Sequence, residues 1–357
     1  MGKLSNIYVL NREKIVVGVI DNAESIIWTS RYFETGDFEI YITATDKNID
    51  LLRTGYYLTR KDNTMVGLIE NIDLVTNIEN GDYLTVTGRD ASCILGRRIV
   101  WDQTNLTGNV ATGINRLIDR NLINSTISER NIPGFKIAAV DTTVFTEKMD
   151  TQLTGDNLLD SIILLCKKYN YGFNVSLDEN KNFVFSLYIG TDRSYGQTST
   201  NKNPYVIFCP NFDNFISSEY TYKIDNYKNV ALIAGEGDGN ARKKQTIGNA
   251  SGIDRYELFV DAKDVSSNDG EIDETNYNLL LRERGLEKLA ETGVVETFNG
   301  QVDSTRTYRL GIDYFLGDIV TVENEYKMQK NVRVTEIIEC LDVNGYSITP
   351  TFADLGG

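Results

Sequence analysis

Short runs in which apolar and polar residues alternate fill the first hundred residues and indicate antiparallel strands. In DFEIYIT, the apolar residues Phe38, Ile40 and Ile42 are separated by Glu, Tyr and Thr, as expected of a sheet with one face in water. Further apolar runs have the sequences IYVL, IVVGVI and SIIWTSRYF, and polar turns separate them. We therefore predict a first β-barrel, or a tightly curled sheet, over residues 1–100.

The spacing of apolar residues changes to that of helices after Trp101. NVATGINRLIDRNLI predicts a helix, and TGDNLLDSIILLCKKYNYGF predicts a second one with Thr154 or Asp156 as its N-cap. The segment FNVSLDENKNFVFSLYI then has the pattern of a hairpin with DENKN as its turn. These elements predict an α+β middle domain over residues 101–212.

Strands resume with SSEYTYKID and NVALIAGEG, and a third helix is predicted in NYNLLLRERGLEKLAETG. Gly285 in the middle of that helix lowers its intrinsic stability by about 1 kcal/mol. Alternating strands return with VVETFNGQV and TRTYRLGID. We expect a second β-barrel made of residues 213–240 and 294–357, interrupted by a helical insertion at 241–293.

Two distant stretches of the chain have the same order of features. The first runs from Gly55 to Gly88 and the second from Gly317 to Phe352. Each contains a glycine, a strand, a polar turn, a second strand with apolar residues around a Glu, another turn, and then a glycine and a third strand. Such an internal repeat predicts two related antiparallel β-modules in one chain.

Length and pattern together predict the fold class. A chain of 357 residues exceeds a comfortable single core, so about two to four domains are expected. The predicted fold is α+β and β-dominated, with two related antiparallel β-barrel modules, an α+β middle domain and a small helical insertion.

The acidic composition argues against a nucleic-acid-binding groove. The chain has 36 Lys and Arg against 51 Asp and Glu, a formal charge of -15, whereas phosphate binding depends on clustered cations. No stretch approaches the roughly 18 to 20 apolar residues of a membrane span, and the amino terminus lacks the apolar core of a signal peptide. We expect no specific nucleic-acid binding, no membrane span and synthesis outside the secretory pathway.

The absence of histidine removes most common catalytic sites. Ser-His-Asp and Cys-His catalysis, HExxH zinc sites and 2-His-1-carboxylate iron sites all need an imidazole. The cysteines lie too far apart for paired metal or redox motifs, and we expect them to be reduced and mostly buried: Cys93, Cys166, Cys209 and Cys340. The sequence therefore predicts no enzyme activity, no cofactor and no metal.

The repeat, the insert between its copies and several short motifs together resemble a known family. The matching parts are GYYLTR, GLIENIDLVTNIENGDYLTVTGRDASCILGRR and YRLGIDYFLGDIVTVENEYKMQKNVRVTEIIECLDVNGYSITPTF, with the G-R-D step at Gly88, the pair Arg97 and Arg98, and the GDIV step from Gly317. In this order and spacing, the chain resembles the baseplate hub and tail-tip proteins of siphovirus-type phages and prophages.

The resemblance implies a structural role at the virion tail tip, after synthesis in the cytoplasm of the bacterial host. Three subunits would form a ring. Because each subunit contributes two similar modules, the ring would have a face with quasi-six-fold symmetry. That ring would join the six-fold tail tube or distal tail protein to a three-fold spike, fibre or lysin, would contact the tape-measure protein, and would let DNA pass through its central channel. Acidic walls would keep the DNA phosphates from adhering.

Aromatic and arginine residues in or beside the repeats are candidates for the subunit interface, because amphipathic rings and guanidinium groups favour buried contacts between proteins. They are Tyr56, Tyr57, Arg89, Arg97, Arg98, Tyr314 and Phe315. Two other functions stay open. One is a cell-wall hydrolase that uses a pair of carboxylates, and the other is a tail-tip adhesin that binds glycans through tyrosines.

Overall fold

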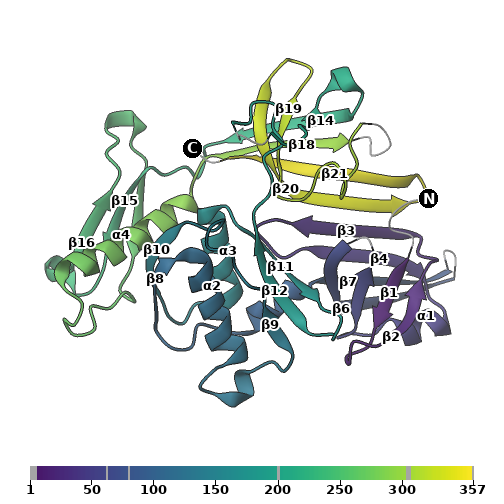
Figure 1. The fold of residues 1–357 in the computed structure, drawn as a ribbon, viewed down its shortest axis with the longest axis horizontal. Coiled ribbons are helices and arrows are strands. Elements are labelled where there is room, and N and C mark those ends of the chain that lie inside the picture. The colour runs from purple at the N-terminus through teal and green to yellow at the C-terminus, as the bar shows by residue number, and fades with distance from the viewer. Residues whose placement is uncertain (1–5, 62, 79–80, 199–201, 303–306, 356–357) are drawn as a thin grey trace.

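One large mixed β-sheet is the main structural element of the computed structural model (Figure 1). The structure describes residues 6–61, 63–78, 81–198, 202–302 and 307–355. The main strand order of the sheet is β14-β18-β21-β20-β3-β4-β7-β6-β5-β1-β2, and β13 and β19 continue it beside β20. The strands are β1 (Ile7–Leu10), β2 (Val16–Ile20), β3 (Ser25–Arg31), β4 (Asp37–Thr43), β5 (Tyr57–Arg60), β6 (Asn63–Asn77), β7 (Gly81–Asp90), β13 (Ile207–Phe208), β14 (Phe215–Lys223), β18 (Val295–Val302), β19 (Ile319–Glu323), β20 (Gln329–Asp342) and β21 (Gly345–Asp354).

The sheet consists of two curled halves that share an edge instead of two separate barrels. We call β3-β4-β7-β6-β5-β1-β2 the amino-terminal half-sheet and β14-β18-β21-β20-β19-β13 the carboxyl-terminal half-sheet. Ile7 of β1 and Trp28 of β3 share one core, and Phe208 of β13 and Phe215 of β14 share another, so each half curls around its own core. Among the described strands, no pairing closes either half, because β3 pairs with β20 instead. The β-dominated α+β fold is confirmed, whereas the strand pairing departs from two closed barrels.

The two glycine-bounded stretches fold as matching three-stranded meanders, β5-β6-β7 and β19-β20-β21. In each, the opening glycine donates its N–H to the long strand, from Gly55 to the Ile69 carbonyl and from Gly317 to the Val334 carbonyl, both at 2.8 Å. Each long strand bulges directly after that carbonyl residue. The flanking strands also match, because β3-β4 adjoin β7 as β14-β18 adjoin β21. The predicted repeat is confirmed as a shared strand order and register.

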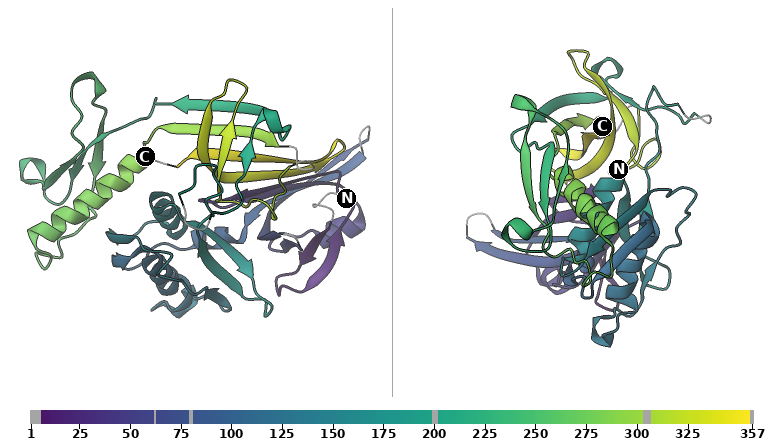
Figure 2. Two further views of the ribbon diagram at one scale, coloured as in Figure 1. Left: turned by 45° about the horizontal axis from the view of Figure 1, so that its top comes forward. Right: turned by 90° about the vertical axis from the view of Figure 1, so that its left-hand side faces the viewer.

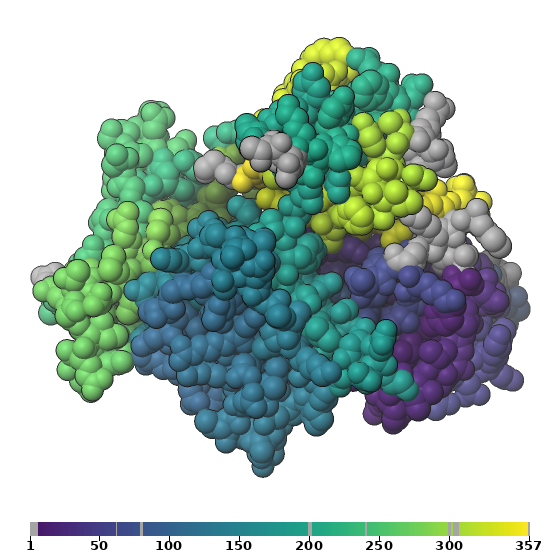
Figure 3. Space-filling view, in the orientation of Figure 1, coloured from purple at the N-terminus to yellow at the C-terminus, as the bar shows by residue number. Residues whose placement is uncertain are grey.

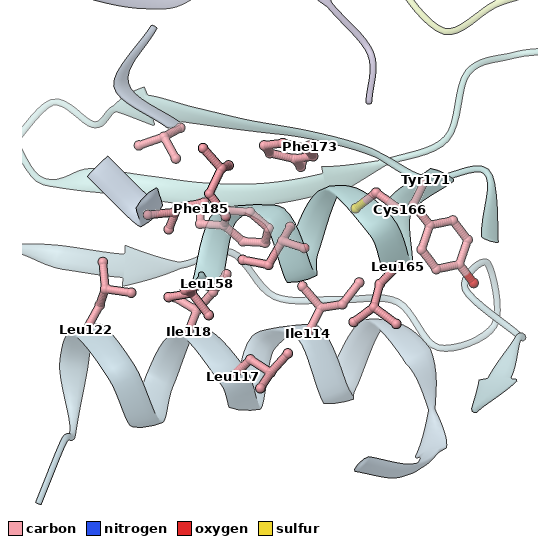
Figure 4. Close-up of a cluster of buried hydrophobic side chains, with 14 of the residues drawn as sticks. Ile114, Leu117, Ile118, Leu122, Leu158, Leu165, Cys166, Tyr171, Phe173 and Phe185 are labelled. Atoms are coloured by element: carbon pink, nitrogen blue, oxygen red, sulfur yellow. The ribbon is translucent and has the colours of Figure 1, made fainter. Parts of the chain in front are cut away.

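The middle part packs two helices against two small sheets around a single apolar core. A two-stranded sheet pairs β8 with β10, a three-stranded sheet has the order β11-β12-β9, and the helices face each other across the core (Figure 4). Its elements are β8 (Thr104–Asn109), α2 (Val110–Ile118), the π-helical turn η2 (Asp119–Ile123), the 3₁₀ turn η3 (Ser128–Arg130), β9 (Phe135–Ile137), β10 (Lys148–Leu153), α3 (Leu158–Tyr169), β11 (Gly172–Leu177) and β12 (Phe183–Tyr188). Both predicted helices and the predicted hairpin are therefore present.

The insertion is a helix lying on a small three-stranded sheet, at the green end of the molecule (Figures 1 and 2). Its sheet has the order β16-β15-β17, with β15 (Val230–Ala234), β16 (Lys244–Ile247) and β17 (Glu257–Asp261), and the helix is α4 (Glu274–Ala290). The strand 230–234, which the sequence assigned to the second barrel, thus pairs within the insertion. Gly285 lets α4 approach that sheet, since a Cβ there would lie 2.6 Å from Ile233 and Ile247 side-chain carbons.

Several local elements differ from the sequence-based prediction. Asn157, and neither Thr154 nor Asp156, caps α3, because its side chain accepts from the backbone N–H of Leu159 at 2.9 Å. The short helix α1 (Asp46–Leu51) and the 3₁₀ helix η1 (Ala91–Arg97) were not predicted. The segment TRTYRLGID is no regular strand over residues 307–313, and its first two residues lie outside the described chain. Further 3₁₀ turns are η4 (Pro210–Phe212), η5 (Gly239–Ala241) and η6 (Gly252–Asp254).

Four clusters of buried apolar side chains follow the four parts of the chain, one in each half-sheet, one in the middle part and one in the insertion. Figure 3 shows the green insertion at the left, the blue middle part at the bottom and the purple amino-terminal half-sheet at the lower right. We propose the division 1–100, 101–212, 213–240 with 294–357, and 241–293 as the structural units. Strand pairing favours moving 230–234 into the insertion.

Gly88 provides a test of the packing inside the amino-terminal half-sheet. A Cβ there would lie 1.9 Å from the Leu68 carbonyl oxygen and 2.9 Å from the Phe38 ring. We expect Gly88→Ala to lower the free energy of unfolding by about 3 kcal/mol, because the backbone must shift. Gly196→Ala is the control, since its Cβ would meet nothing closer than 3.6 Å. Equal unfolding curves for the two variants in urea would contradict this packing.

Candidate assembly interface

The contact between the two half-sheets is a regular antiparallel ladder between β3 and β20. Arg31 lies opposite Glu336 at one end, and Ile26 lies opposite Leu341 at the other. The strands come from opposite ends of the sequence, and Figure 1 shows purple β3 directly beside yellow β20. We call this ladder and the side chains that cross it the internal joint. It shows the chemistry by which one half-sheet of this chain binds another.

A buried ion pair crosses the internal joint. Arg60 donates from Nη1 and Nη2 to the two carboxylate oxygens of Glu339, at 2.9 and 3.2 Å, and the side chains are 2% and 4% exposed. The guanidinium lies 5.5 Å from the centre of the Trp28 ring, and the Tyr346 hydroxyl donates to Glu339. Because both charges are desolvated, each depends on the other for compensation.

A second, half-exposed ion pair marks the end of the ladder. Arg31 donates from Nε to Glu336 at 2.6 Å and from Nη1 to Asp37 at 2.5 Å. The guanidinium therefore links β3 to β20 and to β4 at once. A planar guanidinium with carboxylates on two sides holds the relative direction of the three strands.

Tyr32, directly after β3, lies where three parts of the chain meet. Its backbone N–H donates to the Thr335 carbonyl at 2.9 Å, and its hydroxyl donates to the Asn170 carbonyl of the middle part at 3.0 Å. Its ring is fully buried against Gly172 and Gly317, where any Cβ would lie within 2.4 Å of it. This residue ties the middle part to the internal joint.

Several strand edges of the sheet remain open in the described chain: β2 and β13 pair on one side only, and so do β14 and the second half of β6. β14 pairs with β18 on one side only, and β5 accompanies β6 no further than Leu68. The second half of β6 therefore offers an open edge over residues 71–76, on a hairpin that projects from the body (Figure 2). Leu74 and Val75 on this edge are 51% and 59% exposed. Open edges with exposed apolar residues are surfaces at which another chain can add.

Two grooves lie beside the open edge of β6. One of about 590 Å³ is lined by Ile49 of α1, Tyr56, and Ile72 and Leu74 of β6. The other, of about 540 Å³, is lined by Tyr57, Glu70 and Arg97, and both grooves share Arg12 and Thr54. The first groove is the more apolar, and the second is the more polar.

Four predicted interface residues lie at or near these grooves. Tyr56 and Arg97 line them, and Tyr57 packs edge-on against Phe183 of the middle part, with ring centres 5.4 Å apart. Arg89 is exposed and donates to both oxygens of Glu70 at 2.8 Å, and this bond holds the pKa of Glu70 below its usual value. These residues therefore gather around β6 and β7, as candidates for an interface there.

The other three predicted residues lie elsewhere. Arg98 donates to the Arg130 carbonyl at 3.0 Å within the middle part. Tyr314 is fully buried, with its ring 5.2 Å from that of Phe208, so it belongs to the core of the carboxyl-terminal half-sheet. Phe315 is 44% exposed beneath the guanidinium of Arg193, at a different groove of about 530 Å³. The structure thus does not bring the seven residues into one site.

The residues of the open edges of β14 and β6 were missed by the sequence analysis. Their signal was the alternation of tyrosines in SSEYTYK and the Leu-Val pair in the otherwise polar DLVTN. Nothing in these runs distinguishes an edge strand from a central one, because that depends on which strands pair.

The aspartate of the G-R-D step has a structural role. Asp90 caps η1 by accepting from the Ser92 N–H at 2.7 Å, and it also accepts from the Gly36 N–H. Burial raises the pKa of Asp90 to about 6, against the effect of these hydrogen bonds. Cys93, Cys166 and Cys209 are buried free thiols, whereas Cys340 is half-buried. Within the described ranges, no three His, Cys, Asp or Glu side chains form a metal-binding group, and no helix is long and apolar enough to cross a membrane.

Comparisons with known proteins agree on a tail-protein fold. The family described as Siphovirus ReqiPepy6 Gp37-like protein matches residues 6–354. No curated protein sequence matches the chain. Among solved structures, the 43 kDa tail protein of prophage MuSo2 from Shewanella oneidensis is similar with a TM-score of 0.61 and 13% identity over 98% of both chains.

Two further tail proteins have similar structures. A tail protein from Neisseria meningitidis MC58 has a TM-score of 0.58 and 13% identity, and the match covers 98% of this chain and 96% of that one. Prophage tail protein gp18 from Listeria monocytogenes EGD-e has a TM-score of 0.54 and 13% identity, with 99% and 95% covered. At this identity the likeness shows a common fold.

The buried ion pair of the internal joint gives a testable difference in stability. We expect Arg60→Met to lower the free energy of unfolding by about 3–5 kcal/mol, because Glu339 is left buried without its partner. Replacing Glu339 by Leu in the same chain should regain most of that loss. The control Arg89→Met removes an ion pair whose arginine is 53% exposed, and should cost less than about 1 kcal/mol. Urea unfolding curves in which the two single variants coincide would contradict the role of this pair.

Proposed function

The chain belongs to the family of Siphovirus ReqiPepy6 Gp37-like proteins, and from this premise we propose that it is the hub of a phage tail tip. Its family and fold are those of phage tail proteins, which supports a place in the virion tail. In this proposal three copies form a ring at the end of the tail tube. The ring joins the six-fold tube or distal tail protein to a three-fold spike, fibre or lysin.

The observation that carries the proposal is the repetition of one half-sheet within the chain. The two halves share the order of five strands, β3-β4-β7-β6-β5 and β14-β18-β21-β20-β19, and the same bulge, and they lie edge to edge across the internal joint. Three such chains contain six five-stranded units with this order. A ring of them can therefore match a six-fold partner on one face while keeping three-fold symmetry elsewhere. The curled half-sheets would take the place of the two barrels expected from the sequence.

This function needs contacts and no catalysis. The sequence contains no imidazole, three of its four thiols are buried, and burial raises the pKa of the Cys93 thiol to about 12. A thiol with so high a pKa is a poor nucleophile. We propose that the protein has no enzymatic activity and no cofactor, and that the tape-measure protein and the tail ring are its partners.

A ring-shaped trimer is the direct test of the hub. We expect native mass spectrometry of the purified protein to give three chains per particle, and negative-stain images to show a three-fold particle with a central hole. The physical reason is that six similar edges are satisfied only when the ring closes. A dimer, or a trimer whose centre is filled, would overturn the proposal.

The proposed channel predicts weak affinity for DNA. With a formal charge of -15 on each chain, the assembled protein should bind duplex DNA more weakly than about 100 µM at physiological salt, because the proposed passage would be lined by like charges. Fluorescence anisotropy of a labelled duplex at two salt concentrations measures this. Micromolar binding that weakens with salt would contradict an inert channel and would indicate a basic surface in the assembly.

A further inference from the structure

We propose that β14 of one subunit adds to the open half of β6 in the next subunit, in the register by which β3 adds to β20 within the chain. The inference rests on the proposed trimeric hub and states which surfaces join its subunits. The partner is a second copy of this chain. We call this contact the intersubunit joint.

The four strands hold equivalent places in the repeat. β3 pairs with β4 so that Trp28 lies opposite Phe38, and β14 pairs with β18 so that Tyr220 lies opposite Phe298. The ring centres are 5.6 and 5.9 Å apart in the two pairs. In the same way, β6 and β20 are the bulged middle strands of their meanders. Within the chain β3 covers β20, whereas the described structure leaves their counterparts β14 and β6 uncovered.

The internal joint predicts the register of the intersubunit joint. Within the chain, Ile27 of β3 lies opposite Cys340 of β20. Ile27 is the residue before Trp28, the aromatic that pairs with Phe38, and Cys340 is five residues beyond the bulge of β20 at residue 335. In β14, Glu219 is the residue before the paired aromatic Tyr220. In β6, Val75 is five residues beyond the bulge at residue 70. Glu219 of one subunit is therefore expected opposite Val75 of the next.

The grooves support the same correspondence. The groove of about 530 Å³ at the internal joint is lined by Ile337 and Glu339 of the carboxyl-terminal half-sheet, by Ser30, Arg31 and Met65 of the amino-terminal half-sheet, and by strands β11 and β12 of the middle part. The groove of about 590 Å³ beside β6 has the counterpart of the carboxyl-terminal wall, with Ile72 and Leu74 at the places of Ile337 and Glu339. Its other lining residues come from α1, β7 and the segments at Arg12 and Thr54, and none of them holds the place of β3. Strand β14 of another subunit would take that place.

The side chains that another subunit would bring to this groove are apolar and exposed. Tyr222 of β14 is 55% exposed, and Tyr326 and Met328 in the turn between β19 and β20 are 86% and 44% exposed. On the receiving side, Ile49 and Leu74 are 42% and 51% exposed at the groove. Removing these surfaces from water favours association, and the added ladder satisfies the open backbone groups of both edges.

The intersubunit joint is head-to-tail and uses different surfaces on the two subunits. A head-to-tail contact either closes into a ring or continues as a filament. If it has the geometry of the internal joint, every step around the assembly is alike. Internal and intersubunit joints then alternate, and three chains give six steps.

A charge exchange at the predicted pair tests the register. Val75→Asp places a like charge opposite Glu219 of the neighbour, and Val75→Lys places an opposite charge there. We expect Val75→Asp to lower the association constant of each joint about fivefold, and hence that of the ring with its three joints about a hundredfold. The Val75→Lys variant should associate at least as tightly as the wild type. Glu219→Lys in the Val75→Asp chain should restore association to within about threefold. Sedimentation equilibrium measures the trimer dissociation.

Val343→Asp is the matched control. Val343 is 93% exposed at the turn between β20 and β21, so the same charge is added to the equivalent hairpin of the other half-sheet, away from the proposed joint. This variant should associate like the wild type. Val75 is itself mostly exposed in the single chain, so circular dichroism melting curves of all variants should coincide.

Cysteine cross-linking reports the register independently. Residues directly opposite in an antiparallel ladder have Cα atoms about 4.5–5.5 Å apart, within disulfide range. Glu219→Cys with Val75→Cys should give covalent dimers and trimers on non-reducing gels, whereas Glu219→Cys with Asp73→Cys, two residues out of register, should not. The single-cysteine variants control for the native thiols.

The outcomes separate this joint from the hub itself. Charge rescue together with cross-linking of the in-register pair supports the joint. A stable trimer in which Val75→Asp has no effect, or in which only the out-of-register pair cross-links, overturns the joint and leaves the trimeric hub standing. A wild-type chain that remains monomeric at millimolar concentration overturns both proposals.

Discussion

The pairing of β3 with β20 is the contact on which the rest of the architecture depends. It joins two curled half-sheets from opposite ends of the chain into one sheet, and the buried pair of Arg60 and Glu339 crosses it. The ladder satisfies edge groups that would otherwise be open, and the ion pair disfavours other registers because a slip would leave a buried charge uncompensated. Tyr32 then fixes the middle part against both halves.

The two halves share a register and differ in what covers their middle strands. The far half of β20 is covered by β3, and the equivalent residues of β6 are exposed. The insertion is a second difference between the halves. It lies between β14 and β18, whereas the amino-terminal half has only a short turn at the equivalent place, between β3 and β4. One half-sheet thus accommodates a separate helix and sheet without a change in strand order.

Much of this fold could be predicted from local pattern. Alternation identified the strands of the amino-terminal half, and Gly55, Gly81, Gly317 and Gly345 marked the repeat because all four adopt positive φ. The short helix α1 was missed because six residues carry too little periodicity. The internal joint was missed because it depends on which edges meet, for instance Arg31 with Glu336 across some 300 residues of chain. For the same reason, the candidate interface residues were chosen by type, and Tyr314 lies in a core instead.

Electron cryomicroscopy of the assembled protein, at a resolution that separates strands, tests the central claim most directly. The account predicts six similar sheet contacts around the ring, three within chains between β3 and β20 and three between chains from β14 to β6. A ring held together through the middle parts, with the open edge of β6 facing solvent, would contradict it.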